Sequence, residues 1–125
     1  MLENLPLSTI ATMLDTLPVD LTFMDDQARI VWFSGHRIFN RPPEIVGRDI
    51  HECHLPSSYP VIDKMIADFR SGVRDVEEHF TEKSDGRKIR IRYIAVRDAN
   101  ERYLGSVEMA DDITSIRSPL VEGSL

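Results

Sequence analysis

Three side chains that could bind a metal lie within four residues of this chain. They are His51, Cys53 and His54, and they account for half of the four histidines and for the only cysteine. Imidazole nitrogens and thiolates are ligands that zinc and iron use in proteins. A closed zinc site is disfavoured, because neighbours this close rarely converge on one tetrahedral centre and the sequence offers no second ligand pair. The segment 47–72, which contains this cluster, is the first candidate for a functional site.

The residues that follow the cluster predict a helix that ends at Gly72. Its apolar face is formed by Val61, Ile62, Met65, Ile66 and Phe69, which recur at helical spacing. Upstream, Pro42, Pro43 and Gly47 allow only short helical turns, at about residues 36–39, 43–46 and 49–53.

The rest of the chain predicts one further helix and five strands. Apolar residues at helical spacing predict an amphipathic helix over about residues 7–16; they are Ile10, Met13, Leu14 and Leu17. A hairpin of two strands follows it, and after Gly72 three strands form a meander that ends near residue 113. The turn at 85–86 predicts pairing in which residue numbers sum to about 171, so that Phe80 faces Ile91 and His79 faces Arg92.

These elements predict an α+β domain. Because a lone hairpin is marginal in water, the two groups of strands should join in one five-stranded antiparallel sheet with helices on one face. A length of 125 residues suits one domain. The net charge of −6 argues against nucleic acid and against an anionic membrane surface. A single cysteine, no bilayer-spanning apolar run and no leader pattern favour a cytoplasmic protein.

Catalysis has no comparable support in the sequence. The carboxylate pairs 77–78 and 111–112 are adjacent in predicted strands, so their side chains point to opposite faces. No phosphate-binding loop or dinucleotide fingerprint occurs. Arg90 and Arg92 share a strand face, where ion pairs with neighbours such as Glu77 are favoured over an anion-binding surface. We therefore do not expect an enzyme.

The order of elements and several motifs resemble a PAS domain. Leu-Pro-Val-Asp-Leu-Thr-Phe-Met-Asp at 17–25 looks like the PAS entry strand, and Ile-Val-Gly-Arg-Asp-Ile at 45–50 resembles the step into its central short helix. His54 and Pro56 fall near its His-Pro turn, and Asp-Ile-Thr at 112–114 resembles its exit. The resemblance implies strand order 2-1-5-4-3, an N-terminal helix at 1–18, a PAS domain at 19–116 and a tail at 117–125.

A finer resemblance links the chain to PAS modules attached to hemerythrin-like domains in prokaryotes. The matching segments are 37–42, 53–58 and 91–98. In that subfamily two prolines and a Lys-Ser usually follow the Cys-His, whereas here Leu55 and Ser57 replace the first proline and the lysine. A role tied to those two residues does not carry over. We expect no hemerythrin-like part within these 125 residues, because four histidines in this order cannot build its di-iron bundle.

The PAS resemblance implies a sensory or ligand-binding module, with a haem or a similar planar apolar ligand between the long helix and the sheet. His54 is then the iron ligand, His51 the second choice, and Tyr93 a hydrogen-bond donor to a bound gas. The expected walls are Phe33, Phe39, Ile50, Met65, Phe69, Ile91, Tyr93, Val107 and Met109. Alternatively, His54 packs in a turn, Cys53 is a small buried hydrophobe and no cofactor binds.

The apolar stripe of the first helix, together with Ile94 and Val96 on the outer sheet face, predicts a homodimer. The rival to a sensor is a cofactor-free interaction domain with a filled core that dimerises through its first helix. A separate output partner is expected for a sensor, and its identity is open.

Overall fold

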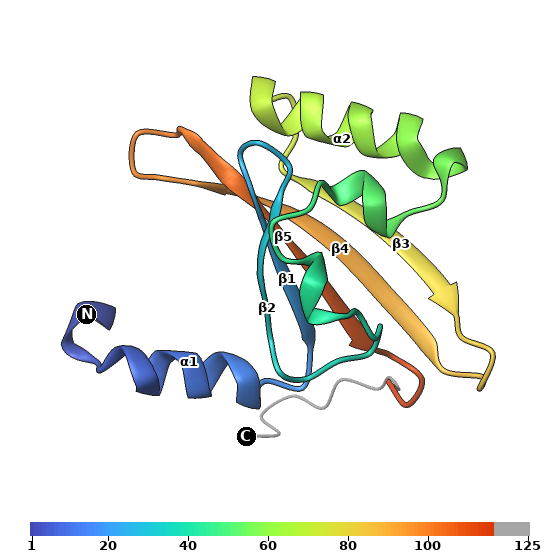
Figure 1. The fold of residues 1–125 in the computed structure, drawn as a ribbon, viewed down its shortest axis with the longest axis horizontal. Coiled ribbons are helices and arrows are strands. Elements are labelled where there is room, and N and C mark those ends of the chain that lie inside the picture. The colour runs from blue at the N-terminus through green and yellow to red at the C-terminus, as the bar shows by residue number, and fades with distance from the viewer. Residues whose placement is uncertain (117–125) are drawn as a thin grey trace, which may run out of the picture.

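Five strands form a single antiparallel sheet in the computed structural model, which describes residues 1–116 (Figure 1). The strands are β1 (Asp20–Asp25), β2 (Ile30–Phe33), β3 (Val76–Glu82), β4 (Lys88–Arg97) and β5 (Tyr103–Asp112). Their spatial order is β2-β1-β5-β4-β3, so the predicted fold class and strand order are confirmed. The predicted tail, 117–125, lies outside the described residues.

Within the described part of the chain, two α-helices and four short 3-10 helices accompany the sheet. They are η1 (Leu2–Asn4), α1 (Leu7–Thr16), η2 (Pro43–Ile45), η3 (Ile50–Cys53), η4 (Pro56–Ser58) and α2 (Tyr59–Ser71). The segment from η2 to α2 lies over one face of the sheet, whereas α1 extends away from it (Figure 1). Gly72 ends α2 in the left-handed conformation, at φ +80°, and its N–H bonds the carbonyl of Phe69.

The apolar face of α2 makes the core. Ile62, Met65, Ile66 and Phe69 are each at most 5% exposed and pack in one cluster with residues of β1, β2, β4, η2 and η3. Burying a side chain of this size stabilises the fold by roughly 1.5–3 kcal/mol. Packing against the sheet therefore fixes α2, and with it every side chain that α2 turns toward the sheet.

The short helix expected at 36–39 does not form. The backbone N–H groups of Ile38 and Phe39 each donate to the Asp20 carboxylate at 2.9 Å, and Arg37 pairs with it at 2.8 Å. Asp20 is completely buried at the start of β1. The carboxylate thus takes the hydrogen bonds that a helical turn would have made, and the prediction of a helix there is wrong.

The predicted register of β3 on β4 is wrong by one residue. His79 pairs with Ile91 and Phe80 pairs with Arg90. The connection is a three-residue loop rather than a two-residue one, because the N–H of Lys83 bonds the carbonyl of Arg87 and Gly86 takes φ +91°. One added residue turns the whole strand over, so His79 joins the face that α2 covers.

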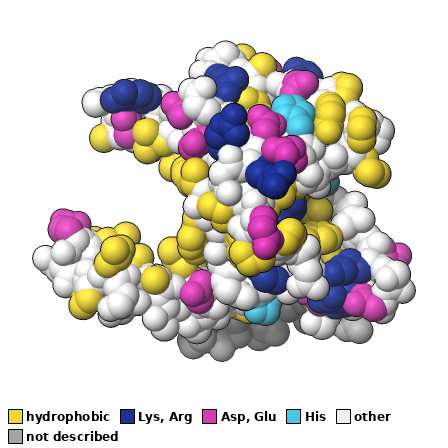
Figure 2. Space-filling model, in the orientation of Figure 1, with side chains coloured by type: hydrophobic (Ala, Val, Ile, Leu, Met, Phe, Trp, Pro, Cys, Tyr) yellow, Lys and Arg dark blue, Asp and Glu magenta, His cyan; other side chains and the backbone are white. Residues whose placement is uncertain are grey.

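The other face of the sheet mixes apolar and charged side chains, and none of the helices within residues 1–116 covers it (Figure 1). Val107 pairs with Ile94 and Met109 pairs with Arg92, and these pairs alternate with the buried pair of Tyr93 and Glu108. Val107 and Met109 therefore point away from α2, and the prediction that they face the interior is wrong. Figure 2 shows α1 projecting from the body of the domain, with hydrophobic side chains on both sides of the hollow between them.

Candidate functional site

A cavity of about 260 Å³ lies between α2 and the strands β3 and β4. Its lining is mainly apolar on the α2 side and mixed on the sheet side, and consists of His54, Ser58, Val61, Ile62, Met65, His79, Ile91 and Tyr93. Four of the predicted site residues line this space: His54, Met65, Ile91 and Tyr93. The elements that position them are η3 with its following residue, α2 and β4, which belong to distant parts of the sequence.

A hydrogen bond joins His54 and Tyr93, which both line the cavity. The Nε2 atom of His54 lies 3.2 Å from the Tyr93 hydroxyl, and its Nδ1 atom lies 3.0 Å from the carbonyl oxygen of Ile50. A carbonyl oxygen can only accept, so Nδ1 carries a hydrogen and donates. In the neutral imidazole Nε2 is then an acceptor that faces the cavity.

Tyr93 is a neutral phenol at any ordinary pH. Burial raises the pKa of Tyr93 well above its usual value, and the charge of Glu108 beside it raises the pKa further. The two residues are opposite each other on β4 and β5. The hydroxyl therefore keeps its one hydrogen and can donate one hydrogen bond while its oxygen accepts another.

An ion pair lies beside the cavity. Arg41 donates from Nη2 to the Glu108 carboxylate at 3.2 Å, and both side chains are largely buried. They line a separate, adjoining space of about 490 Å³, whose lining shares four residues with that of the first: His54, Ser58, Ile91 and Tyr93. Phe39, a predicted wall residue, lines this second space. The two charges neutralise each other, so this pair leaves no uncompensated charge in the adjoining space.

Cys53 also lines the adjoining space. Burial raises the pKa of its thiol, which keeps the sulfur protonated and poorly nucleophilic at neutral pH. The cysteine packs against the main core cluster. These features fit the interpretation of Cys53 as a small buried hydrophobe.

His79 is a site residue that the sequence analysis missed. It enters the cavity because of the three-residue loop after β3, and its Nε2 lies 3.3 Å from Glu77. The Asp-Gly pair at 85–86 is compatible with both loop lengths, so the sequence held no signal that separated the two registers.

His51 does not face the cavity. Its Nδ1 bonds the carboxylate of Asp49, and its Nε2 bonds the carboxylate of Asp63 on α2. The structure therefore separates the two histidines of the sequence cluster, and His51 cannot join His54 at one centre without breaking both contacts. Within residues 1–116 no group of three or more His, Cys, Asp and Glu side chains could hold a metal ion.

The remaining predicted wall residues are core rather than lining. Ile50 and Phe69 are at most 2% exposed inside the main cluster, and Phe33 packs against that cluster beneath the guanidinium of Arg37. Arg90 and Arg92 lie on the outer face. Arg90 makes two hydrogen bonds to Asp111 there, so Asp111 is its partner rather than Glu77.

The site supplies a nitrogen atom that could ligate haem iron, but it lacks the space for the porphyrin. The His54 tautomer with its hydrogen on Nδ1 leaves Nε2, which lies toward the cavity, as the nitrogen that could ligate iron. The space is too small, since a cavity of about 150 Å³ holds one benzene ring and a porphyrin is several times larger than benzene. The Tyr93 hydroxyl also occupies the position that the iron would take. Haem would therefore require α2 to move away from the sheet.

An antiparallel sheet in this strand order, covered on one face by short helices and one longer helix, defines the PAS class of α+β domains. Residues 10–114 match the family model described as PAS domain, and the chain belongs to the PAS family. Domains of this family are common in signal-transduction sensors and are typically sensory rather than catalytic. No curated protein matches the chain.

Several solved structures share this fold. A C-terminal domain from Streptococcus mutans is 26% identical over 87% of this chain and 86% of its own, with a TM-score of 0.81. The PAS domain of a Colwellia psychrerythraea protein is 18% identical over 88% and 98%, with a TM-score of 0.63. The PAS domain of Bordetella pertussis BvgS is 15% identical over 87% of both chains, with a TM-score of 0.65. None of the helices in residues 1–116 has the length and apolar composition that crossing a bilayer requires.

Proposed function

We propose that this PAS domain is a sensory module that binds a small molecule in the cavity between α2 and the sheet. The observation that carries the proposal is the hydrogen-bonded pair of His54 and Tyr93, set in a cavity whose helix side is apolar and which lies beside a second space. Ligand sites are usually of this kind, with an apolar lining and a few polar groups that fix orientation. The alternative function, an interaction domain, predicts a core filled by side chains and does not explain this space.

Native mass spectrometry of the protein purified from its source cells tests the proposal. We expect an added mass that disappears on denaturation, and we expect Val61→Trp to lose it, because Val61 is half-exposed at the cavity. Val73→Trp is the matched control, since Val73 is exposed after α2 and lines neither part of the site. An unliganded protein that also binds none of the small molecules in a broad library would favour the interaction domain.

Haem is the second candidate for the same place, favoured by the tautomer of His54 and disfavoured by the available space. An absorption spectrum of protein expressed with a haem supply decides it, with wild type measured beside His54→Ala and His51→Ala. Absence of a Soret band removes haem. A band that only His54→Ala abolishes would establish His54 as the ligand and would require α2 to move.

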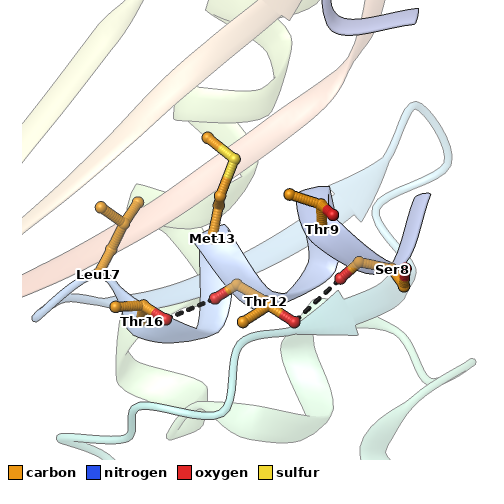
Figure 3. A pocket seen from close by; sticks show the side chains of 6 residues that line it. All are labelled: Ser8, Thr9, Thr12, Met13, Thr16 and Leu17. Carbon is orange, nitrogen blue, oxygen red and sulfur yellow. Dashed lines mark hydrogen bonds between the residues drawn. The ribbon is translucent and has the colours of Figure 1, made fainter. Parts of the chain in front are cut away.

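Self-association through α1 is the second part of the proposed function. None of the ten residues of α1 is buried, and Met13 and Leu17 are each nearly half-exposed. An isolated helix this short is marginal in water, so a packing partner would stabilise it. Figure 3 shows Met13 and Leu17 on the same side of α1, while the hydroxyls of Thr12 and Thr16 donate to backbone carbonyls of the helix. A second copy packing there would leave those hydroxyls satisfied.

Light scattering at micromolar concentration tests the homodimer. We expect about twice the 14.3 kDa mass of the chain for the wild type. Met13→Asp should give the mass of the monomer, because it would bury a charge without a partner. Ala11→Asp is the control, because it introduces the same residue on α1 outside the pocket of Figure 3, and it should stay dimeric. That pocket is lined by Ser8, Thr9, Thr12, Met13, Thr16 and Leu17. A wild-type monomer would remove the proposal.

The finer family assignment and the cellular setting also stay proposals. The Cys-His-Leu-Pro-Ser-Ser segment at 53–58 supports a relation to the PAS modules attached to hemerythrin-like domains. The cytoplasm stays the predicted compartment, and a separate output partner stays expected. Identification of a di-iron protein that co-purifies from source cells with the wild type would support this setting.

A further inference from the structure

The cavity between α2 and the sheet has a size, a charge balance and a hydrogen-bond balance that restrict its ligand. We infer that the ligand is a neutral molecule of about two fused rings that donates one hydrogen bond to the Tyr93 hydroxyl oxygen. This inference rests on the proposed function and specifies its ligand class.

Size sets the first restriction. The space measures about 260 Å³. An engineered cavity of roughly 150 Å³ holds benzene, whereas sites for drug-sized molecules begin near 300 Å³. A bicyclic aromatic molecule lies between these limits. The apolar floor of Ile62, Met65 and Ile91 suits the faces of such a ring system.

Charge sets the second restriction. Among the described residues that line this cavity there is no Lys, Arg, Asp or Glu. Arg41 and Glu108 line the adjoining space and are paired with each other. Glu77, which lies 3.3 Å from Nε2 of the lining residue His79, is paired with Arg74. A charged ligand would lose its hydration without gaining a counter-charge, and that loss is costly. The site therefore selects a neutral molecule.

The hydrogen-bond balance sets the third restriction. The Tyr93 hydroxyl has one hydrogen, and two acceptors lie beside it, the Nε2 atom of His54 and the carboxylate of Glu108. The Nδ1–H group of His54 donates its hydrogen bond to the carbonyl of Ile50, so it is not a donor to Tyr93. Acceptors thus outnumber donors around this hydroxyl, and its oxygen retains an open lone pair. A ligand N–H or O–H group supplies the missing donor.

Four probes test the three restrictions by calorimetry and by chemical-shift changes in the ¹⁵N spectrum of the protein. Indole has the right size and one N–H donor, and benzothiophene has nearly the same shape without the donor. Indole-3-carboxamide and indole-3-carboxylate differ in charge but hardly in size. We expect indole to bind about two- to tenfold more tightly than benzothiophene, the usual effect of one hydrogen bond. We expect the carboxamide to bind at least about tenfold more tightly than the carboxylate.

Two variants locate the binding. Tyr93→Phe keeps the ring and removes the hydroxyl, so indole and benzothiophene should bind it equally. Val61→Trp should abolish indole binding, whereas the control Val73→Trp should bind indole like the wild type.

The outcomes separate the ligand class from the proposed function. Equal binding of carboxylate and carboxamide, or of indole and benzothiophene by the wild type, overturns the ligand class and leaves a small-molecule site standing. Failure of all four probes, or indole binding that survives Val61→Trp, overturns the cavity as the binding site and with it the proposed function.

Discussion

His51 ties η3 to α2 through Asp63. The Nε2 atom of His51 bonds the Asp63 carboxylate while its Nδ1 atom bonds Asp49, the residue that caps η3. Two carboxylates can both accept only if both ring nitrogens carry hydrogen, so the contact requires the charged imidazolium. Hydrogen bonds from His51 to Asp49 and then to Asp63 accordingly raise the pKa of His51 above its ordinary value.

This contact predicts that stability falls as pH rises above the ordinary pKa of histidine. A raised pKa in the folded state means that the contribution of His51 is fully present below its unfolded pKa, near 6.5, and is lost as pH rises through the higher folded pKa. Burial opposes the shift of Asp49, but its hydrogen bonds with His51 lower its pKa, so its contribution is lost only at acidic pH. Thermal unfolding from pH 5 to 9 should show a fall in Tm that His51→Gln removes. The exposed His36 provides the control, since His36→Gln should keep the fall. An NMR titration that gives His51 a pKa at or below 6.5 would contradict the assignment.

Asp20 predicts the largest loss of stability from a single polar substitution. Removing its carboxylate leaves the guanidinium of Arg37 unpaired and the N–H groups of Ile38 and Phe39 without an acceptor. Breaking a buried ion pair from one side costs about 3–5 kcal/mol. Urea denaturation of Asp20→Ala should show a loss of this size, while the exposed Asp26→Ala should stay within about 0.5 kcal/mol of the wild type. A loss for Asp20→Ala of less than about 1 kcal/mol would mean that water replaces these contacts.

Gly105 and Gly86 form a matched pair of glycine substitutions. Both have positive φ, but a Cβ at Gly105 would lie 2.2 Å from the carbonyl oxygen of Met24, whereas none of the described atoms lies within 4 Å of a Cβ at Gly86. Gly86→Ala should cost about 1–2 kcal/mol, the usual penalty for a left-handed alanine. Gly105→Ala should cost at least roughly 3 kcal/mol, because the added clash lies between two paired strands. Equal losses in chemical denaturation would show that β1 and β5 can separate locally at no cost.

The order of elements could be predicted because the periodicity of each segment is strong. The helix ending at Gly72 and the strands around Tyr93 carry an apolar face opposite a polar one. The face of β5 could not be predicted the same way, since Val107 and Met109 form an apolar set but lie on the uncovered side. Glu108 takes the buried position instead, and Arg41, which neutralises it, lies 67 residues away. The local periodicity of a strand gives no information about an ion-pair partner so distant in the sequence.

The candidate site was predictable only in part for the same reason. His54 and Tyr93 both face the cavity, as expected, although they meet each other rather than an iron atom in this structure. The position of His79 in the cavity depends on a single residue in the length of the loop after β3. The orientation of His51 depends on its contact with Asp63, which looks in the sequence like any solvent-facing residue of an amphipathic helix. Side chains whose role is set by a distant contact were the ones that sequence reasoning misplaced.

The pairing of β1 with β5 has a mechanical consequence. The start of β1 and the end of β5 lie side by side at one end of the sheet, where Asp20 pairs with Ala110. A pulling force applied to the chain just before β1 and just after β5 would load their hydrogen bonds one after another, as in opening a zip, rather than all together in shear. The domain should therefore yield at low force from these two points. Tension along α1 would first part β1 from β5 close to Glu108, which lines the space beside the cavity.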